Sequence, residues 1–258
     1  MAAVEPVPGE PAAVADCGDE RALVVADYHA GIETGLRYER GVELRSDADG
    51  RRTRLLALVE RVEPDRVIVL GDLIHRIGDP GVDERDEVVA LLDALDDRGL
   101  PLTLVPGNHD GGVAEAYGDR LTVADAGGHR RGDVGFVHGH TWPDRSILGA
   151  RTLCMGHEHP QVRLEDEVGG GRTEKTWLRG PLRADPFADE LGVDPAALSW
   201  PDPPPELVVF PAFNDRSGGT WINVEGQSFL APFLPAALDD AAEAYLLDGT
   251  RLGAYRRI

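Results

Sequence analysis

Three short apolar runs that alternate with stretches of helical spacing constrain the fold of this chain more than any other feature. The runs Arg21–Ala26, Arg66–Leu70 and Leu100–Val105 have the composition of buried strands. Between them, residues 51–63 and 83–98 place leucine and valine on one face of a helix. This strand–helix–strand–helix–strand order predicts a largely parallel sheet covered by helices.

The second half of the chain predicts a further sheet. Helices are scarce in this half, apart from one expected over Pro235–Ala244. We interpret the Pro- and Asp-rich residues 184–205 as a surface excursion within a single domain that spans residues 1–258. A closing hairpin is expected around Asp248-Gly249. The strand candidates, which indicate a mixed or antiparallel sheet packed on the first, are Asp133–Val137, Thr152–Met155, Gln161–Glu165, Thr173–Leu178 and Glu206–Phe210.

Composition excludes several classes of protein. The 258 residues suffice to bury a sizeable core, and a hydrophobic share of 42% excludes a disordered acidic tail. No apolar run reaches the roughly 18 residues of a membrane-spanning helix, and the N-terminal residues lack the pattern of a secretory signal. Two cysteines are too few for a disulfide framework. We therefore expect a cytoplasmic protein without a membrane partner.

The charge balance has two interpretations. The chain has 46 acidic and 26 basic residues, a net charge of −20, and Lys175 is its single lysine. One interpretation is an acidic protein that avoids nucleic acid. The other, which we favour, is adaptation to a high-salt cytoplasm, where a Debye length of about 3 Å at 1 M salt screens the self-repulsion. GC-rich coding would favour arginine over lysine but would not explain the acidic excess.

Histidine and acidic residues gather directly after the predicted strands. Because the carboxyl ends of the strands converge on the ligand crevice of an open α/β sheet, these groups are expected to meet. Imidazole, carboxylate and carboxamide ligands suit a divalent cation such as Mn²⁺, Fe²⁺, Zn²⁺, Co²⁺ or Ni²⁺. Each group alone is more typical of a turn, but all five in this order favour a metal site. The groups are Asp27-Tyr28-His29, Gly71-Asp72, Gly107-Asn108-His109-Asp110, His138-Gly139-His140 and Gly156-His157-Glu158-His159.

This ordered set resembles the motifs of the calcineurin-like metallophosphoesterases over roughly Ala22–His159. The segments Pro211–Asn214, Gly218-Gly219 and Gly71–His75 are similar to a narrower branch of archaeal phosphoesterases. Bacterial relatives of that branch are associated with a DNA ligase and a helicase. The resemblance implies a four-layer α/β/β/α sandwich of two mixed sheets flanked by helices. The narrower branch implies an archaeal source and an association with DNA repair proteins.

The resemblance also implies roles for individual residues. Asp72 would bridge two metal ions, and His109 would be the catalytic imidazole. Asp110 would orient His109 or, equally, would bond to nearby backbone. The first metal would be held by Asp27, His29, Asp72 and His159. The second would be held by Asp72, Asn108, His138 and His157.

The expected reaction is hydrolysis of a phosphate ester. Two cations about 3.5–4 Å apart, which we expect to be Mn²⁺, would share a hydroxide that attacks phosphorus. His109 would protonate the leaving group or stabilise the charge on the phosphoryl oxygens. We expect a phosphodiesterase that acts either on DNA or RNA or on a small or cyclic nucleotide. A non-catalytic scaffold is the alternative class, which the intact ligand set and His109 disfavour.

Several residues are candidates for substrate contact, each with a structural alternative. His140 would line the cleft or lie behind the ligands. His75 would reach the cleft or make a structural hydrogen bond. Asn214 would reach the site or cap the segment that follows it. Arg37, Arg40 and Arg76 would bind phosphate, although a given arginine among 25 is more often a plain surface residue.

Overall fold

A computed structural model describes residues 3–165 and 169–258, and it contains two β-sheets that pack face to face. The first sheet has the strand order β1-β2-β3-β4-β5-β6. Strands β3 to β6 run parallel, whereas β1 and β2 are antiparallel additions at one edge. The bounds are β1 Val4–Pro6, β2 Ala12–Asp16, β3 Arg21–Ala26, β4 Arg66–Leu70, β5 Leu102–Leu104 and β6 Thr122–Val123.

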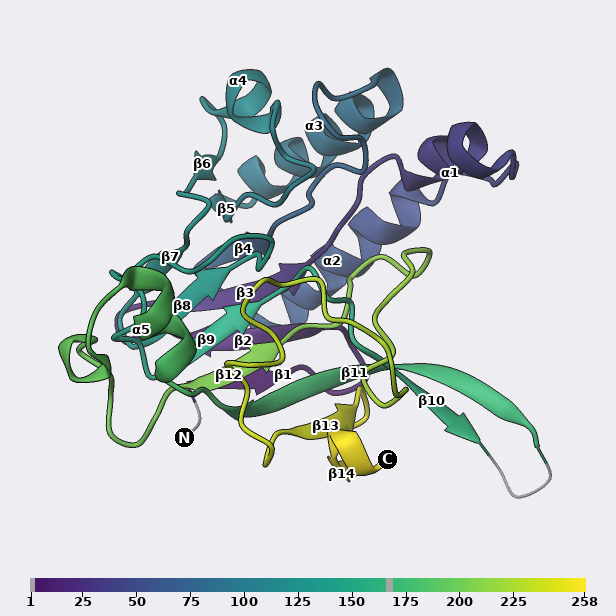
Figure 1. Ribbon diagram of the computed structural model, residues 1–258. Helices are drawn as coiled ribbons and strands as arrows, with labels where there is room; N and C mark the ends of the chain where they lie inside the picture. Colours follow the sequence, from purple (N-terminus) through teal and green to yellow (C-terminus); the bar gives the residue numbers. More distant parts are fainter. Residues whose placement is uncertain (1–2, 166–168) are drawn as a thin grey trace.

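The second sheet is mixed, with the order β14-β13-β11-β12-β9-β8-β7 and with β10 paired to β11. Strands β8, β9 and β12 are parallel to one another, and the remaining pairs are antiparallel. The β10–β11 hairpin projects from the body of the molecule (Figure 1). The bounds are β7 His129–Arg131, β8 Val134–Val137, β9 Thr152–Met155, β10 Gln161–Glu165, β11 Gly171–Pro181, β12 Glu206–Val209, β13 Glu243–Leu246 and β14 Arg251–Ala254.

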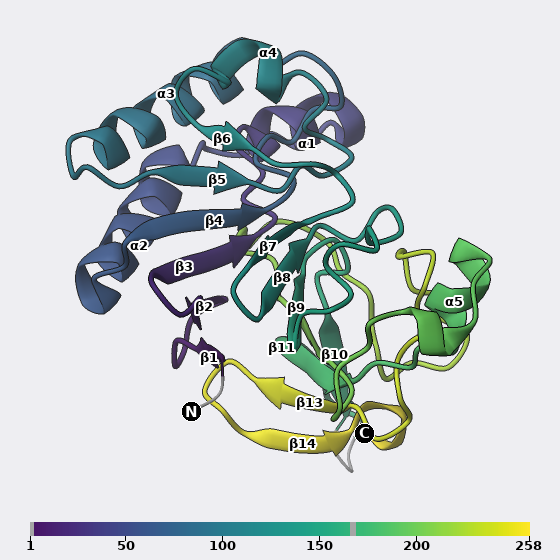
Figure 2. The same cartoon turned by 90° about the vertical axis from the view of Figure 1, so that its left-hand side faces the viewer.

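Helices cover the outer faces of both sheets, which confirms the predicted four-layer α/β/β/α arrangement. Helices α2 and α3 pack on the first sheet (Figure 2). The outer face of the second sheet is covered by α5 and by irregular segments. The helices are α1 Ile32–Arg40, α2 Ala48–Val62, α3 Val82–Asp96, α4 Val113–Tyr117 and α5 Asp185–Leu191, with 3-10 turns at Pro195–Ala197 and Tyr255–Arg257.

Strand β3 shows why its sequence is apolar throughout. Ala22 and Val24 face the second sheet, whereas Leu23 and Val25 face the helices. Successive side chains of a strand point to opposite faces, so a strand covered on both sides is apolar at every position. This double burial fixes the position at which β3 ends and the polar residues begin.

The helix predicted over Pro235–Ala244 is wrong. The segment consists of turns, and Glu243 and Ala244 begin β13 by pairing with β11. Phe233, Leu234 and Leu238 are buried against the second sheet. Sheet pairing and burial of apolar side chains thus override the helical propensity of the alanines.

Other segments depart from the sequence expectations in smaller ways. Strands β1 and β2 were not predicted, because their residues show no long alternating pattern. Residues 184–205 contain α5, and Phe187 and Leu198 within them are buried in the core of the second sheet. The expected hairpin is formed by β13 and β14. Within residues 3–165 and 169–258, no helix is long and apolar enough to span a membrane.

Candidate metal centre

The five polar groups lie at the carboxyl ends of strands from both sheets. His138 follows β8 directly, and Asp72 lies two residues beyond β4. Figure 2 shows that β3 and β4 end next to the sheet that contains β8 and β9. The two layers thus bring loops from opposite sheets to one place, as the order of the strands predicts.

The backbone at this place is in an uncommon conformation. Six non-glycine residues of the described chain have a positive φ, and five of them belong to the predicted ligand set. Such left-handed conformations are costly for residues with a Cβ and cluster where function requires them. The five residues are Asp27 (φ 57°), His29 (51°), Asp72 (49°), His157 (68°) and His159 (44°).

Two glycines allow the loops to approach closely. A Cβ added to Gly107 would lie 2.2 Å from Oδ1 of Asp72, and one added to Gly219 would lie 2.1 Å from the His159 carbonyl oxygen. Neither contact is tolerable for a side chain. The glycines at these motif positions therefore serve the close packing of the ligand loops.

Three groups of potential ligands form at the centre among the described residues. One joins His29 to His75 and His109, and the other two consist of predicted metal ligands and are called the first and second clusters. In the first, Asp27, His29 and His159 offer ligand atoms that all lie within 4.8 Å of one another. Nε2 of His159 is 3.1 Å from Oδ1 of Asp27. In the second, the same limit holds for Asp72, His138 and His157.

Asp72 lies between the two clusters. Its Oδ2 is 3.8 Å from Nε2 of His29, and its Oδ1 is 3.4 Å from Nε2 of His138. The amide oxygen of Asn108 is 3.3 Å from the same His138 nitrogen. One carboxylate therefore contacts imidazoles of both clusters, which is the arrangement expected of a bridging ligand.

Backbone carbonyls fix the orientation of two of these imidazoles. Nδ1 of His138 donates to the Leu70 carbonyl over 2.8 Å, and Nδ1 of His159 donates to the Gly218 carbonyl over 2.7 Å. In a neutral ring the proton on Nδ1 leaves the Nε2 lone pair free, and both Nε2 atoms face carboxylates. Metal-binding histidines are held in this way, so the donor set fits divalent cations.

Burial and pairing set the ionisation of the ligands. Burial lowers the pKa of His157 to about 3 and lowers the pKa of His29 well below its usual range. Burial opposes charge on His159 as well, but the Asp27 carboxylate outweighs it and raises the pKa of His159 to about 9. Burial alone would raise the pKa of Asp27, but His159 and the nearby His138 and His29 lower it to about 2. These shifts favour a cationic His159 paired with Asp27 near pH 7 and neutral His29 and His157.

Binding of a cation to the first cluster is expected to release about one proton near pH 7.5, because His159 must become neutral to bind it. Calorimetric titration of metal-free protein with Mn²⁺ in two buffers of different ionisation enthalpy measures this release. The release should disappear as the pH rises above about 9, where His159 is already neutral. The His159→Ala variant is the control, and wild-type protein that releases no proton near pH 7.5 would contradict the ion pair.

His109 and Asp110 have different surroundings. The side chain of His109 is 21% exposed, its Nε2 lies 3.8 Å from Oδ2 of Asp72, and its Nδ1 contacts the His75 carbonyl oxygen. Asp110 is buried and accepts hydrogen bonds from the backbone N–H groups of Leu73, Ile74 and Gly107. These contacts favour the backbone-bonding role for Asp110, and the His75 carbonyl orients His109 instead.

The candidates for substrate contact lie at different distances from the centre. Asn214 is buried, donates to the Tyr28 carbonyl over 3.1 Å and accepts from the Arg216 N–H, so it caps the following segment and holds the β3–α1 loop. His140 lies with its ring centroid 5.4 Å from that of His138, and its Nδ1 has no hydrogen-bond partner among the described residues. The ring of His75 packs against those of His29 and His109, which also contact each other.

A buried ionic network that the sequence analysis did not identify supports the loop with Asp27 and His29. Arg51 of α2 donates to Glu33 of α1 over 2.6 Å and to Glu87 of α3 over 2.8 Å. Glu87 accepts the N–H of Gly31, two residues after His29. All three charged residues are at most 5% exposed. The sequence analysis predicted the helices that carry Arg51 and Glu87 but not the helix that carries Glu33. It therefore could not reveal that the two glutamates share one arginine.

Replacement of Arg51 by methionine is expected to lower the free energy of unfolding by about 3–5 kcal/mol, because Glu87 would be left buried without a cation. Urea denaturation measures the loss. The matched control is Arg52→Met on the same helix, whose partner Asp49 is 90% exposed and whose loss should stay below about 1 kcal/mol. Equal losses in the two variants would contradict the role of the network.

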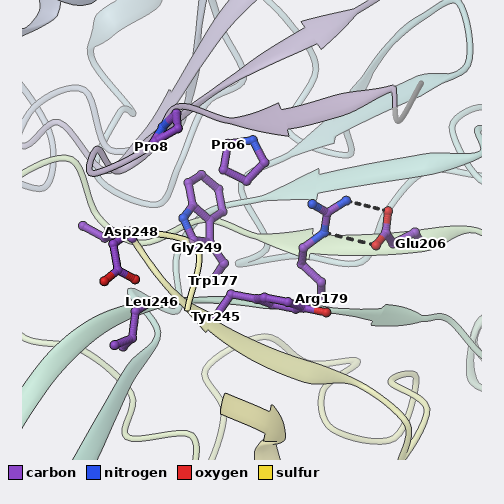
Figure 3. Close-up of a pocket in the computed structure, with 10 residues that line it drawn as sticks. Pro6, Pro8, Trp177, Arg179, Glu206, Tyr245, Leu246, Asp248 and Gly249 are labelled. Atoms are coloured by element: carbon purple, nitrogen blue, oxygen red, sulfur yellow. Dashed lines mark hydrogen bonds and ion pairs between the residues drawn. The ribbon is translucent and has the colours of Figure 1, made fainter. Parts of the chain in front are cut away.

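A separate cavity of about 340 Å³ lies between the turn after β1 and the β13–β14 hairpin (Figure 3). Its walls include Pro6, Pro8 and Trp177, and the Arg179–Glu206 ion pair closes one side. None of the residues that line it belongs to the predicted ligand set. The chemistry of the strand ends is thus distinct from this cavity.

A family model agrees with the motifs, and one solved structure agrees with the fold. A family model of calcineurin-like phosphoesterases matches residues 20–208. The crystal structure of nuclease MPE from Pseudomonas putida is similar over 96% of this chain and 100% of that chain, with a TM-score of 0.55 and 17% sequence identity. The structure of YfcE, a phosphoesterase from E. coli, matches 56% of this chain and 73% of that chain, with a TM-score of 0.34 and 16% identity.

Proposed function

The chain belongs to the calcineurin-like phosphoesterase family of metal-dependent hydrolases, and we propose that it is a two-metal phosphodiesterase that prefers Mn²⁺. The observation that carries this proposal is the position of Asp72, whose two oxygens face the imidazoles of separate clusters. A single-metal site would not need a carboxylate in that position.

The first cation would be held by Asp27, His29, Asp72 and His159. The second would be held by Asp72, Asn108, His138 and His157. Bound there, the cations would supply a water of lowered pKa and would offset the charge of the phosphate. Because the ligands are held by backbone carbonyls and by the surrounding loops, little reorganisation is required when the cations bind.

His109 is the residue that we assign to proton transfer. Its Nδ1 is bound to the His75 carbonyl, so Nε2 is the atom free to carry a transferable proton. That atom points to the centre of the site, 3.8 Å from Asp72. In this position His109 protonates the leaving oxygen of the ester or stabilises the charge on the phosphoryl group.

The surroundings of the site favour nucleic acid over a small enclosed nucleotide. Glu39 of α1 lies 3.7 Å from His75, so the last turn of α1 adjoins the site. That turn carries Arg37, Arg40 and Tyr38, and the tyrosine is 84% exposed. Arginine suits phosphate and an exposed aromatic ring suits stacking with a base. The fold shared with the P. putida nuclease is consistent with this preference.

A substrate panel tests the proposed function. Protein loaded with Mn²⁺ at high KCl is mixed with bis(p-nitrophenyl) phosphate, p-nitrophenyl phosphate, single-stranded and duplex DNA, RNA and cyclic nucleotides. We expect cleavage of the diester and of at least one nucleic acid, and loss of both activities when the metal is removed with a chelator. Well-folded, metal-loaded protein that cleaves none of these esters would instead support a non-catalytic scaffold.

We interpret the net charge of −20 as an adaptation to a solvent of high salt concentration. We propose that the protein acts in the high-salt cytoplasm of a halophilic archaeon, together with DNA repair proteins. At such salt concentrations a basic surface adds little to the binding of a phosphate backbone. Cations held by Asp72 and the other buried ligands would still offset the charge of the phosphate, because salt screens interactions at buried sites less than those at the surface.

A further inference from the structure

His29 differs from His138 and His159 in the partner of its outer nitrogen. His138 and His159 each direct Nδ1 to a backbone carbonyl. Nδ1 of His29 instead lies 3.4 Å from Nδ1 of His75. A carbonyl can only accept, whereas an imidazole nitrogen either donates or accepts. The proton position on His29 therefore depends on another side chain.

We propose that His75 is a positioning residue for the first metal site. When Nε2 of His29 binds a cation, its proton must lie on Nδ1, and the nearest acceptor for that proton is Nδ1 of His75. This requires the proton of His75 to be on Nε2. That nitrogen is buried without a hydrogen-bond partner among the described residues and lies 3.7 Å from Oε1 of Glu39. The ring of His75 thus selects the tautomer of His29 that exposes a lone pair to the cation.

The fold holds His75 firmly enough for this role. Its N–H donates to the Ala30 carbonyl over 3.1 Å, which ties it to the loop that carries His29. Its ring stacks on that of His109 with a centroid distance of 5.7 Å and an angle of 24°. On the far side, a Cβ on Gly35 would lie 2.2 Å from Cδ2 of His75, so a glycine is needed there. The ring is confined between α1 and the site.

The same residue serves two imidazoles through different atoms. The side chain of His75 faces His29, and its backbone carbonyl holds Nδ1 of His109. A substitution at position 75 therefore removes the first contact and leaves the second. With only 14% of its side chain exposed, His75 is better placed to support the ligands than to bind the substrate directly.

The test rests on the ligand assignment of the proposed function and measures metal binding rather than turnover. In an Asn108→Ala background, which lacks a ligand of the second cluster, titration with Mn²⁺ reports on the first site. His75→Leu is expected to weaken that affinity by roughly 10–100-fold, the usual cost of losing a partner of a metal-bound histidine. His75→Asn, which places an amide oxygen where Nδ1 was, is expected to restore it to within about threefold.

Two further variants keep the test decisive. His75→Gln is polar like His75→Asn but places its amide near the position of Nε2, so it should not restore the affinity. If His75→Leu fails to fold, the comparison of the Asn and Gln variants still tests the proposal. In a His159→Ala background, where the second site remains, none of the changes at position 75 should alter the Mn²⁺ affinity. His129→Leu, a change at a half-buried histidine of β7, is the stability control.

Unchanged Mn²⁺ affinity in the His75→Leu variant would overturn the proposal, as would equal affinity in the Asn and Gln variants. A rise in KM for the ester with unchanged metal affinity would assign His75 to substrate contact instead. Failure of the wild-type protein to cleave any ester would refute the proposed function and would leave the metal titration as an independent result.

Discussion

Replacement of His109 by alanine is expected to leave both metal sites intact and to lower turnover by roughly 10²–10⁴-fold. His109 lies at the centre of the site, yet its Nδ1 bonds to a backbone carbonyl, and it belongs to neither the first nor the second cluster. It forms a separate group with His29 and His75. Metal content measured by atomic emission and turnover of bis(p-nitrophenyl) phosphate at high KCl provide the two readouts.

The leaving group distinguishes the two roles considered for His109. A p-nitrophenolate leaves without protonation, whereas the alkoxide released from a nucleic acid needs a proton. If His109 is the general acid, the loss in His109→Ala should be much larger for DNA or RNA than for the p-nitrophenyl ester. Equal losses would assign His109 to charge stabilisation, and unchanged turnover on both substrates would exclude it from the reaction.

The residues of the site that lie at the ends of buried strands could be predicted from the sequence. The double burial of β3 and β4 makes each strand apolar up to its last residue, so Asp27 and Asp72 mark the strand ends. Parallel strands must then bring these residues to one edge. For this reason the motif order predicted which side chains meet, and the structure places their ligand atoms within 4.8 Å of one another in two clusters.

The parts that depend on contacts between distant segments were not visible. The His75 carbonyl that orients His109 has no sequence signal, since every residue has a carbonyl. Asn214 was considered for the site because of its motif, but it is buried and its side chain donates to the Tyr28 carbonyl in the β3–α1 loop. The helix predicted over Pro235–Ala244 failed for a related reason, because pairing with β11 decides the conformation of Glu243 and Ala244. Local sequence patterns predict burial well, but they predict poorly which distant residues will contact each other.

Replacement of Asp72 by asparagine is expected to weaken cation binding at both sites. The loss of affinity should exceed the roughly 10–100-fold that follows when a metal ligand loses its hydrogen-bond partner. Its two oxygens face His29 and His138, so the removal of one charge affects both clusters. The fold should survive, because an asparagine oxygen can still accept the N–H of His109, which bonds to Asp72 over 3.1 Å. Turnover should fall at least as far as in His109→Ala.

The matched control for Asp72→Asn is Asp27→Asn, which removes the same charge from a predicted ligand of the first cluster. Asp27 touches the second cluster only through the backbone N–H of His157 and through Nδ1 of His138, which donates to the Leu70 carbonyl, so it is not expected to bind the second cation. Paired Mn²⁺ ions give a spin-coupled electron paramagnetic resonance spectrum, and a single ion gives six lines. Asp27→Asn should therefore retain one ion with the six-line spectrum, whereas Asp72→Asn should bind neither ion tightly. Two tightly bound, spin-coupled ions in Asp72→Asn would show that the carboxylate between the clusters is not their shared ligand, and the two-metal reaction would need another bridge.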